Sequence, residues 1–268
     1  MTDTDFGMRL DPLDAVRGTA PSARHDPFIL RLQRYVHLTK SDLESLLRVM
    51  ECEEKVKRRR DLVNEGYVYS KLYFITDGFA ARYKLLRNGK RQIVTFVLPG
   101  DIVGLPVSFF DRATYSVMAV TDMTMRVCSL EAFVALCYRV PKLALALSWF
   151  AVHEAATYSE TIINIGRRTP VERVAHFLLE MHARLTTIGR AGKTGFDLPI
   201  TQEMMSDALG LSVPHLNRML ARLRREGLIA ITGSHVEFPD LKAIQQFVHF
   251  HFAMPTRIPL PPLATRQV

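Results

Sequence analysis

Arginine is concentrated in one short segment of the chain. Between Val213 and Arg225 there are four arginines and no acidic residue, whereas the whole chain of 268 residues holds 35 Lys and Arg against 27 Asp and Glu. A guanidinium pairs with phosphate oxygens and, in a bidentate manner, with the O6 and N7 acceptors of guanine. The segment therefore favours a nucleic-acid partner. The alternative is a solvated helix face formed by Arg222, Arg224 and Arg225.

The arginine-rich segment is the second half of a helix-turn-helix pattern that begins at Thr201. Ala208 is small enough to let two helices cross, Gly210 permits the turn, and Leu216 and Leu220 would anchor the second helix. The sequence also predicts a short strand before this pattern, over 196–200, and a two-stranded flap after it, over 228–231 and 236–238. Such a flap would reach the backbone of a bound duplex.

Residues typical of catalysis are present but are not spaced for it. His176 and His182 are six apart, so the zinc motif H-E-x-x-H is absent, and no C-x-x-C pair follows His235-Val-Glu237. A glycine-rich phosphate loop and G-x-S-x-G are absent as well. The sequence therefore predicts that the chain is not an enzyme, with no catalytic residue and no metal site.

The three cysteines, Cys52, Cys128 and Cys137, lie too far apart in the sequence to suggest a disulfide framework. We expect reduced thiols, each serving as a small buried hydrophobic residue. A redox-sensitive thiol at Cys52 or Cys128 is the alternative.

A second basic run covers 55–60. Three glutamates between Glu51 and Glu54 precede it, and Asp61 follows. Because opposite charges alternate so closely, we interpret the run as a self-neutralised solvated edge rather than as a second nucleic-acid site.

The segment from Lys57 to Thr124 carries the period of β-strands. Apolar residues alternate with their neighbours, and turn signals recur at about 11-residue intervals. The strongest of them is Asn88-Gly89, which lies between two strand-like runs and predicts a tight hairpin. The sequence therefore predicts a small antiparallel β-roll of the jelly-roll type, within an α+β fold.

Two helical patterns flank the roll. Ser41, with Glu44 three residues later, predicts a capped amphipathic helix over 41–50. A longer helix is expected over 141–166, where apolar residues recur at steps of three or four. This stripe predicts a connector or a dimer seam, and the alternative is packing on its own domain; its members are Leu143, Leu147, Ala151, Ala155, Tyr158, Ile162 and Ile165.

Length and composition limit the class of protein. A chain of this size with 48% hydrophobic residues is expected to form about two domains. Its longest strongly apolar stretch, Leu143–Ala151, is far shorter than the ~20 residues of a membrane span. Residues 1–10 contain charges instead of the apolar core of a secretory signal. We expect a cytoplasmic protein without a membrane partner.

On these residues the chain resembles the Crp/Fnr family of transcription regulators, over about residues 28–245. The resemblance rests on the roll glycines Gly66, Gly78, Gly100 and Gly104, the long helix after Pro141, and the run from Leu198 to Phe238. It implies an effector roll of the cyclic-nucleotide-binding type, a dimerisation helix and a winged helix-turn-helix that binds a palindromic operator on double-stranded DNA as a homodimer. The implied domains are a leader (1–27), the roll (28–140), the helix (141–166), the DNA-binding domain (167–250) and a tail (251–268).

The effector pocket departs from the family pattern. Members that respond to cyclic AMP hold its phosphate with a Gly-Glu and an Arg-Ser pair, whereas here Gly104 is followed by Leu105 and the second place reads Tyr115-Ser116. We therefore expect no cyclic AMP binding of the usual kind. With only three cysteines, an iron–sulfur cluster of the oxygen-sensing type is not expected either. The effector stays unknown.

The resemblance also implies the DNA contacts. Residues matching Val213, Pro214, Asn217 and Arg218 approach base edges in the family. Arg218 would read guanine and Asn217 adenine, but Pro214 stands where the family commonly has a Glu that contacts cytosine. The half-site sequence is therefore not predicted. The complete candidate set is Thr201, Ser212, Val213, Pro214, His215, Asn217, Arg218 and Arg222, with phosphate contacts expected from Thr201, Ser212 and His215.

Two alternatives remain open from the sequence. The first is a ligand- or haem-binding sensor or adaptor whose helix-turn-helix contacts a protein; haem would need an axial ligand, for which the cysteines are candidates without a supporting pattern. The second is whether the bound protein activates or represses transcription, which the sequence does not distinguish. RNA polymerase is the further partner implied for an activator.

Overall fold

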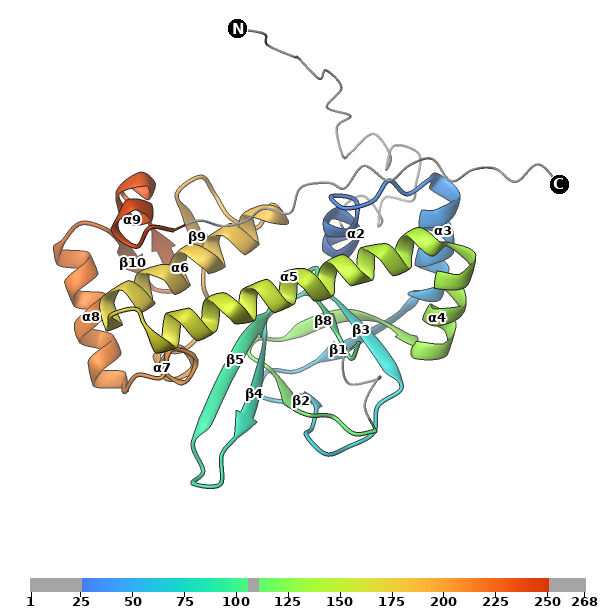
Figure 1. Ribbon diagram of the computed structural model, residues 1–268, viewed down its shortest axis with the longest axis horizontal. Helices are drawn as coiled ribbons and strands as arrows, with labels where there is room; N and C mark the ends of the chain where they lie inside the picture. The colour runs from blue at the N-terminus through green and yellow to red at the C-terminus, as the bar shows by residue number, and fades with distance from the viewer. Residues whose placement is uncertain (1–25, 106–110, 251–268) are drawn as a thin grey trace, which may run out of the picture.

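The computed structural model describes residues 26–105 and 111–250. An antiparallel β-roll with three short helices at one end is joined by the long helix α5 to a helical unit at the other end (Figure 1). This is the predicted α+β architecture. No helix among the described residues is long and apolar enough to cross a membrane.

The roll consists of two four-stranded sheets in the orders β1-β8-β3-β6 and β2-β7-β4-β5, and every pair is antiparallel. Apolar side chains between them, among them Val63, Ile75 and Val117, are fully buried. The strands are β1 Cys52–Val56, β2 Asp61–Val63, β3 Lys71–Asp77, β4 Ala80–Leu85, β5 Arg91–Val97, β6 Ile102–Val103, β7 Ser116–Ala119 and β8 Met123–Ser129.

The hairpin predicted at Asn88-Gly89 is confirmed. It joins β4 to β5, and Gly89 has a φ of +78°, which a residue with a side chain rarely adopts. Asn88 Oδ1 accepts a hydrogen bond from the backbone N–H of Lys90 at 3.1 Å, and the Leu86 N–H donates to the Lys90 carbonyl at 2.8 Å. Local turn chemistry is therefore sufficient to specify this hairpin.

The short helices are α2 (Pro27–Leu32), α3 (Lys40–Val49) and α4 (Leu130–Arg139). The cap predicted for α3 at Ser41 and Glu44 is wrong, because the helix begins one residue earlier. Thr39 and Asp42 form a capping box in which the Thr39 N–H donates to Asp42 Oδ2 at 2.8 Å and the Asp42 N–H donates to Thr39 Oγ1 at 3.2 Å. Thr39 and Asp42 have the same three-residue spacing as Ser41 and Glu44, but they were not predicted from the sequence as a capping box.

Helix α5 spans Pro141–Gly166 and changes neighbours along its length. Its first half packs into an apolar cluster with the three short helices, where Leu143, Ala146 and Phe150 are buried. Its outer side is exposed. That side, here called the outward face of α5, consists of Ala144, Leu145, Ser148, Ala151, Val152, Ala155, Ala156, Ser159, Ile162 and Ile163.

The predicted stripe on α5 therefore divides into two groups. Ala151, Ala155 and Ile162 belong to the outward face, with Ile162 72% exposed. The other four, Leu143, Leu147, Tyr158 and Ile165, are buried or half-buried within the chain itself. At about 100° per residue the seven positions spread over roughly 120° of the helix, so Leu143 lies at one edge of the stripe and Ala155 at the other. The expectation that Leu143 faces another copy is wrong.

The C-terminal unit contains α6 (Pro170–Thr187), β9 (Gly195–Asp197), α7 (Gln202–Leu209), α8 (Val213–Arg225), β10 (Ala230–Thr232), β11 (His235–Glu237) and α9 (Leu241–Phe247). Its three strands form one antiparallel sheet in the order β10-β11-β9. The strand expected over 196–200 ends at Asp197, because Pro199 has no N–H to continue a ladder.

One apolar cluster crosses the junction between the roll and the C-terminal unit. Ile93 and Phe96 of β5 lie in the same buried core as Phe177 of α6, and the rings of Phe96 and Phe177 are 5.8 Å apart. The two units are thus packed against each other and not merely linked by α5.

Candidate nucleic-acid interface

Helices α7 and α8 form a helix-turn-helix. Thr201 caps α7, its side chain accepting a hydrogen bond from the Met204 N–H at 3.2 Å. Gly210 has a φ of +64° and ends the helix in the left-handed conformation, as a C-terminal glycine commonly does. Leu216 and Leu220 are buried against the unit's core. The anchors predicted from the sequence therefore have the predicted burial.

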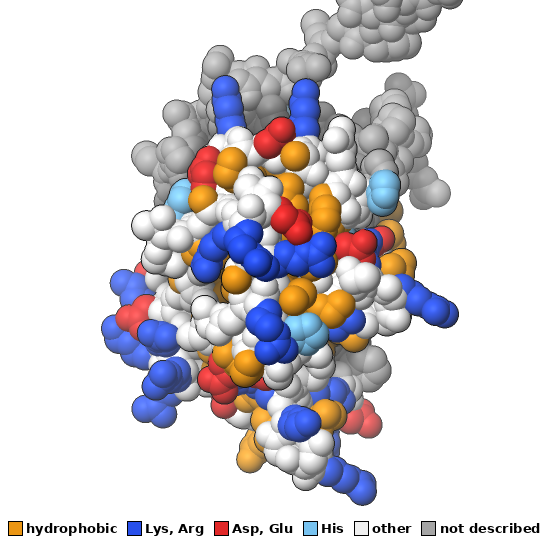
Figure 2. Space-filling model, turned by 90° about the vertical axis from the view of Figure 1, so that its left-hand side faces the viewer, with side chains coloured by type: hydrophobic (Ala, Val, Ile, Leu, Met, Phe, Trp, Pro, Cys, Tyr) orange, Lys and Arg blue, Asp and Glu red, His pale blue; other side chains and the backbone are white. Residues whose placement is uncertain are grey.

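The opposite side of α8 is exposed to solvent. Pro214, Asn217 and Arg218 lie on it, together with the other three arginines of the helix. Arg222 is held by Glu226, whose Oε1 is 2.7 Å from Arg222 Nε. Helix α8 lies at the left of Figure 1, and the space-filling view of that side shows Lys and Arg side chains spread across it (Figure 2).

The remaining candidate residues lie at the helix N-termini. Thr201 and Ser212 are both exposed and precede the first turns of α7 and α8. The Ser212 side chain makes no capping hydrogen bond to α8, so its hydroxyl can donate to an external acceptor. Val213 and His215 are half-buried. A helix N-terminus with an exposed hydroxyl is suited to a phosphate oxygen.

The flap predicted after α8 is present as the hairpin of β10 and β11. At its edge His235 lies between two carboxylates: Nδ1 is 2.9 Å from Asp197 Oδ1 and Nε2 is 3.3 Å from Glu237 Oε2. The hydrogen bond to Asp197, followed by that to Glu237, raises the pKa of His235 above its usual 6.5.

We expect this raised pKa to make the contribution of His235 to stability pH-dependent. A group whose pKa is higher in the folded state stabilises the fold fully below its unfolded pKa, and this stabilisation is lost as the pH rises through the folded pKa. NMR titration of the imidazole should show the raised pKa, and Asp197→Asn should return it towards 6.5. Identical titration curves for the two proteins would contradict the assignment.

Contacts from the roll fix the position of α7. Arg91 of the β4–β5 hairpin donates from Nε to Asp207 Oδ2 at 2.8 Å, and Gln92 Nε2 donates to the Ala208 carbonyl at 3.3 Å. A separate ion pair joins the roll to α6, where Arg184 Nη2 lies 2.9 Å from Asp101 Oδ2. These pairs were not predicted from the sequence, because their members are more than 80 residues apart.

Arg91→Met should lower the free energy of unfolding by about 1 kcal/mol, the upper end for a pair that retains some exposure. Arg91 and Asp207 are 22% and 25% exposed. Lys84→Met is the matched control on the same hairpin, because the Lys84–Glu65 pair is 49% and 41% exposed and should contribute less. Urea denaturation of the three proteins measures both changes, and equal losses would show that the Arg91 contact does not anchor the hairpin.

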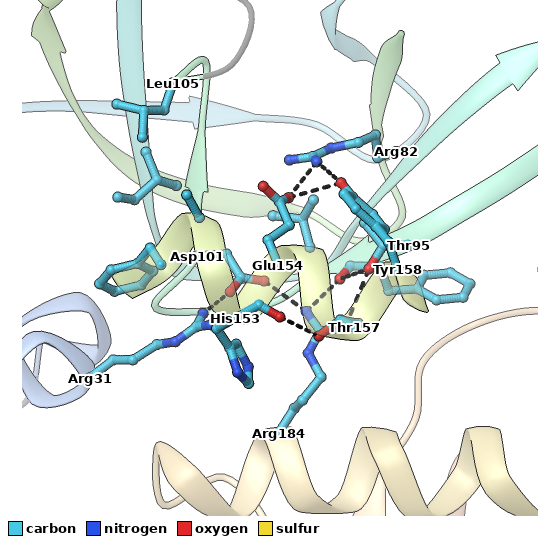
Figure 3. A pocket seen from close by; sticks show the side chains of 15 residues that line it. Arg31, Arg82, Thr95, Asp101, Leu105, His153, Glu154, Thr157, Tyr158 and Arg184 are labelled. Atoms are coloured by element: carbon cyan, nitrogen blue, oxygen red, sulfur yellow. Dashed lines mark hydrogen bonds and ion pairs between the residues drawn. The ribbon is translucent and has the colours of Figure 1, made fainter. Parts of the chain in front are cut away.

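A cavity of about 260 Å³ lies between the roll, α5 and α6. Ionisable side chains from all three elements line it, and Figure 3 shows that they point towards one another. Of the predicted pocket residues only Leu105 lines this cavity. The guanidinium of Arg82 lies over the ring of Tyr115, with Arg82 Cζ 4.4 Å from the ring centre. Ser116 Oγ accepts a hydrogen bond from the Glu65 N–H at 3.0 Å. Gly104 has a φ of +104°, which a residue with a side chain rarely adopts.

The charges of the cavity are paired within the chain. Arg82 is buried and bonds both Glu154 and the hydroxyl of Tyr158 on α5. Burial alone would lower the pKa of Arg82, but Tyr115, Glu154 and Tyr158 outweigh it and raise the pKa. His153 has its pKa lowered to about 4, by burial first and then by Arg31 and Arg184, so it is neutral at pH 7. The guanidinium of Arg82 is thus already matched by a carboxylate of the same chain.

Only the lysines of the basic run over 55–60 form ion pairs among the described residues, and Lys57 does so with a residue far away in the sequence. Lys57 Nζ is 2.8 Å from Asp122 Oδ2, and the Arg58 N–H donates to Asp122 Oδ1 at 2.9 Å. Asp61, the predicted neighbour, instead accepts from the Tyr83 hydroxyl at 3.2 Å.

The prediction that each thiol is buried is wrong for Cys52, and Cys137 is only half-buried. Cys52 is exposed on β1, whereas Cys128 is buried and has its pKa raised to about 12, by burial first and then by Cys137. Cys128 therefore stays a protonated thiol at pH 7, which fits the predicted role of a small buried hydrophobic residue.

Comparison with known proteins agrees with this geometry. The family model of the cyclic nucleotide-binding domain matches residues 53–139. The family model of the Crp-like helix-turn-helix domain matches residues 172–247. The chain is 32% identical over 181 residues to the transcriptional activatory protein AadR of Rhodopseudomonas palustris, covering 68% of this chain and 74% of that one. The chain belongs to the Crp/Fnr family of transcription regulators.

Two further Crp/Fnr relatives extend the comparison. The nitrogen fixation regulation protein FixK of Bradyrhizobium diazoefficiens is 31% identical over 177 residues, 66% of this chain and 73% of that one. The solved structure of FixK2 from Bradyrhizobium japonicum is 25% identical, covers 73% of this chain and 96% of that chain, and superposes with a TM-score of 0.66. As a Crp/Fnr member, this chain is a DNA-binding transcription regulator and not an enzyme, and regulators of the family typically bind DNA as dimers.

Proposed function

We propose that two copies of the chain associate through the outward face of α5 and bind a palindromic operator with their two α8 helices. The observation that carries the proposal is this face itself. It is apolar, it runs along most of a 26-residue helix, and Val152 and Ile162 on it are 65% and 72% exposed. An apolar strip of this length is costly to leave in water and is typical of a helix that pairs with its own copy.

The dimer gives the DNA contacts their symmetry. Each α8 would enter a major groove, with half-sites about one helical turn apart. Arg218 and Asn217 are the residues for base readout, while Thr201, Ser212, His215 and Arg222 would contact phosphates. Pro214 offers neither a charge nor a side-chain donor, and Val213 offers only apolar contact. The operator therefore differs from those read through a glutamate at the place of Pro214.

Selection of bound fragments from a random DNA library, followed by footprinting, tests the proposal. We expect protection of a palindrome, with an affinity that falls steeply as salt is raised because phosphate contacts release counterions. Absence of any protected palindrome at low salt would favour the alternative, a sensor or adaptor whose helix-turn-helix binds a protein. A function on chromosomal DNA would place the chain in the cytoplasm, and RNA polymerase is the partner an activator would contact.

The paired charges of the cavity support a further part of the proposal, that cyclic AMP is not the effector through the usual contacts. A phosphodiester anion needs an unpaired guanidinium, but Arg82 is held by Glu154 and Tyr158. Leu105 and Tyr115 also stand at the places of the family's acidic and basic ligands, and neither side chain replaces the charge.

A further inference from the structure

Arg173 of α6 lies where three helices meet. Its Nη1 donates to the carbonyl of Leu209 at 2.8 Å, and its Nη2 donates to the carbonyls of Ile165 at 2.8 Å and of Arg168 at 3.4 Å. Leu209 is the last residue of α7, and Ile165 lies in the last turn of α5. One guanidinium therefore holds the C-terminal ends of both helices.

The chemistry of this contact is specific to arginine. The last carbonyls of a helix have no partner within the helix and carry the negative end of its dipole. A planar guanidinium has five donors in a fixed arrangement and can bind two such ends at once, whereas the ammonium of lysine is a point charge. Among the described residues no carboxylate forms an ion pair with Arg173. The two helix ends supply the compensating negative charge instead.

Arg173 also lies close to the end of α5 and to the turn of the helix-turn-helix. Asn164, which is buried at the end of α5, donates from Nδ2 to the Arg173 carbonyl at 3.3 Å. A Cβ placed on Gly210, the turn of the helix-turn-helix, would lie 3.9 Å from Arg173 Nη1 and 4.0 Å from Cγ2 of Ile165. The turn between α7 and α8 therefore lies directly against the end of the helix that carries the outward face.

We propose that Arg173 is a positioning residue for DNA binding, because it fixes the helix-turn-helix relative to α5. In a dimer joined through α5, this junction sets the distance between the two α8 helices and hence the spacing of the half-sites that the protein accepts. The inference rests on the proposed function. The inference adds that the guanidinium of Arg173, which touches no DNA, defines the operator spacing.

The test compares binding of the full-length protein to DNA fragments in which the selected half-site is repeated with a series of spacer lengths. Wild type should prefer one spacing. Arg173→Met keeps the length of the side chain but has no donors. It should lower the ratio of affinities for the preferred and the other spacings about tenfold, the factor that corresponds to the loss of one charge-assisted hydrogen bond. Binding to a single half-site should change much less, because α8 itself is unaltered.

Two variants separate positioning from stability. Arg173→Lys keeps the charge but cannot bind both helix ends in the same way, so it should also lose spacing preference; full retention would overturn the proposal. It also carries the test if Arg173→Met does not fold. Leu178→Ala removes a fully buried side chain of the same helix and should reduce stability while leaving the spacing preference unchanged.

The two proposals fail in different ways. If wild type binds no palindrome, the proposed function is wrong. If wild type binds a palindrome with one preferred spacing and Arg173→Met keeps that preference, the proposed function stands and the role of Arg173 is overturned. An equal loss of spacing preference in Leu178→Ala would also overturn it, since general destabilisation would then explain the effect.

Discussion

Ile162→Asp is expected to convert the dimer into a monomer and to weaken binding to a two-half-site operator by roughly 10²–10⁴-fold, the gain that linking two binding modules provides. Ile162 is 72% exposed on the outward face of α5, so the carboxylate costs little in the isolated chain. In a symmetric dimer it would be buried together with its copy and without a counter-charge. Sedimentation velocity measures the association state, and DNA titration measures the affinity.

The control for this experiment is a similar change elsewhere. Val68 is 71% exposed in the roll, so Val68→Asp should leave the dimer and its DNA binding intact. Leu147→Asp is not a clean test, because Leu147 is half-buried and packs on the chain's own core. A stable Ile162→Asp dimer in solution would contradict the proposed interface.

Arg218→Ala should cost about 1–3 kcal/mol on the selected operator and relax its specificity at one base pair. Arg218 is exposed on α8, about one turn before the cluster of arginines that ends the helix. A bidentate pair with guanine distinguishes that base from the other three, so its loss affects matched DNA more than mismatched DNA. Binding to operators that carry each of the four bases in turn measures the difference.

Arg222→Ala is the matched control, because Arg222 is exposed in the last turn of the same helix and is one of the proposed phosphate contacts. We expect it to weaken binding evenly on all sequences and to lower the salt dependence, as the loss of a phosphate contact would. An equally uniform loss for Arg218→Ala would show that Arg218 also contacts phosphate and that the base reading lies elsewhere.

The features predicted correctly from the sequence are those with a local cause. Asn88-Gly89 determines its hairpin through a left-handed turn, Gly210 ends α7, and the spacing of Leu216 and Leu220 defines which side of α8 is buried. Each depends on neighbours within a few residues, which a single sequence displays directly. The family resemblance then supplied the order of the elements.

The features that could not be predicted depend on residues far apart in the chain. Arg82 and Glu154 are separated by 72 positions, and Arg31 and Asp101 by 70, so no spacing rule pairs them. The outward face of α5 was only partly identified for the same reason, because burial along this helix is decided by the short helices α2, α3 and α4 at one end and by α6 at the other. Arg173 was missed because its partners are backbone carbonyls, which leave no signature in residue type.

The apolar cluster that joins β5 to α6 has a consequence for how the molecule can be divided. Contacts between domains are commonly polar and permit relative motion, but here Phe96 and Phe177 belong to one continuous core. Cutting the chain after Gly166 would expose that core on both pieces. The DNA-reading half is therefore not a cassette that can be transplanted alone onto another sensor, and a functional graft would have to carry the β4–β5 hairpin with it.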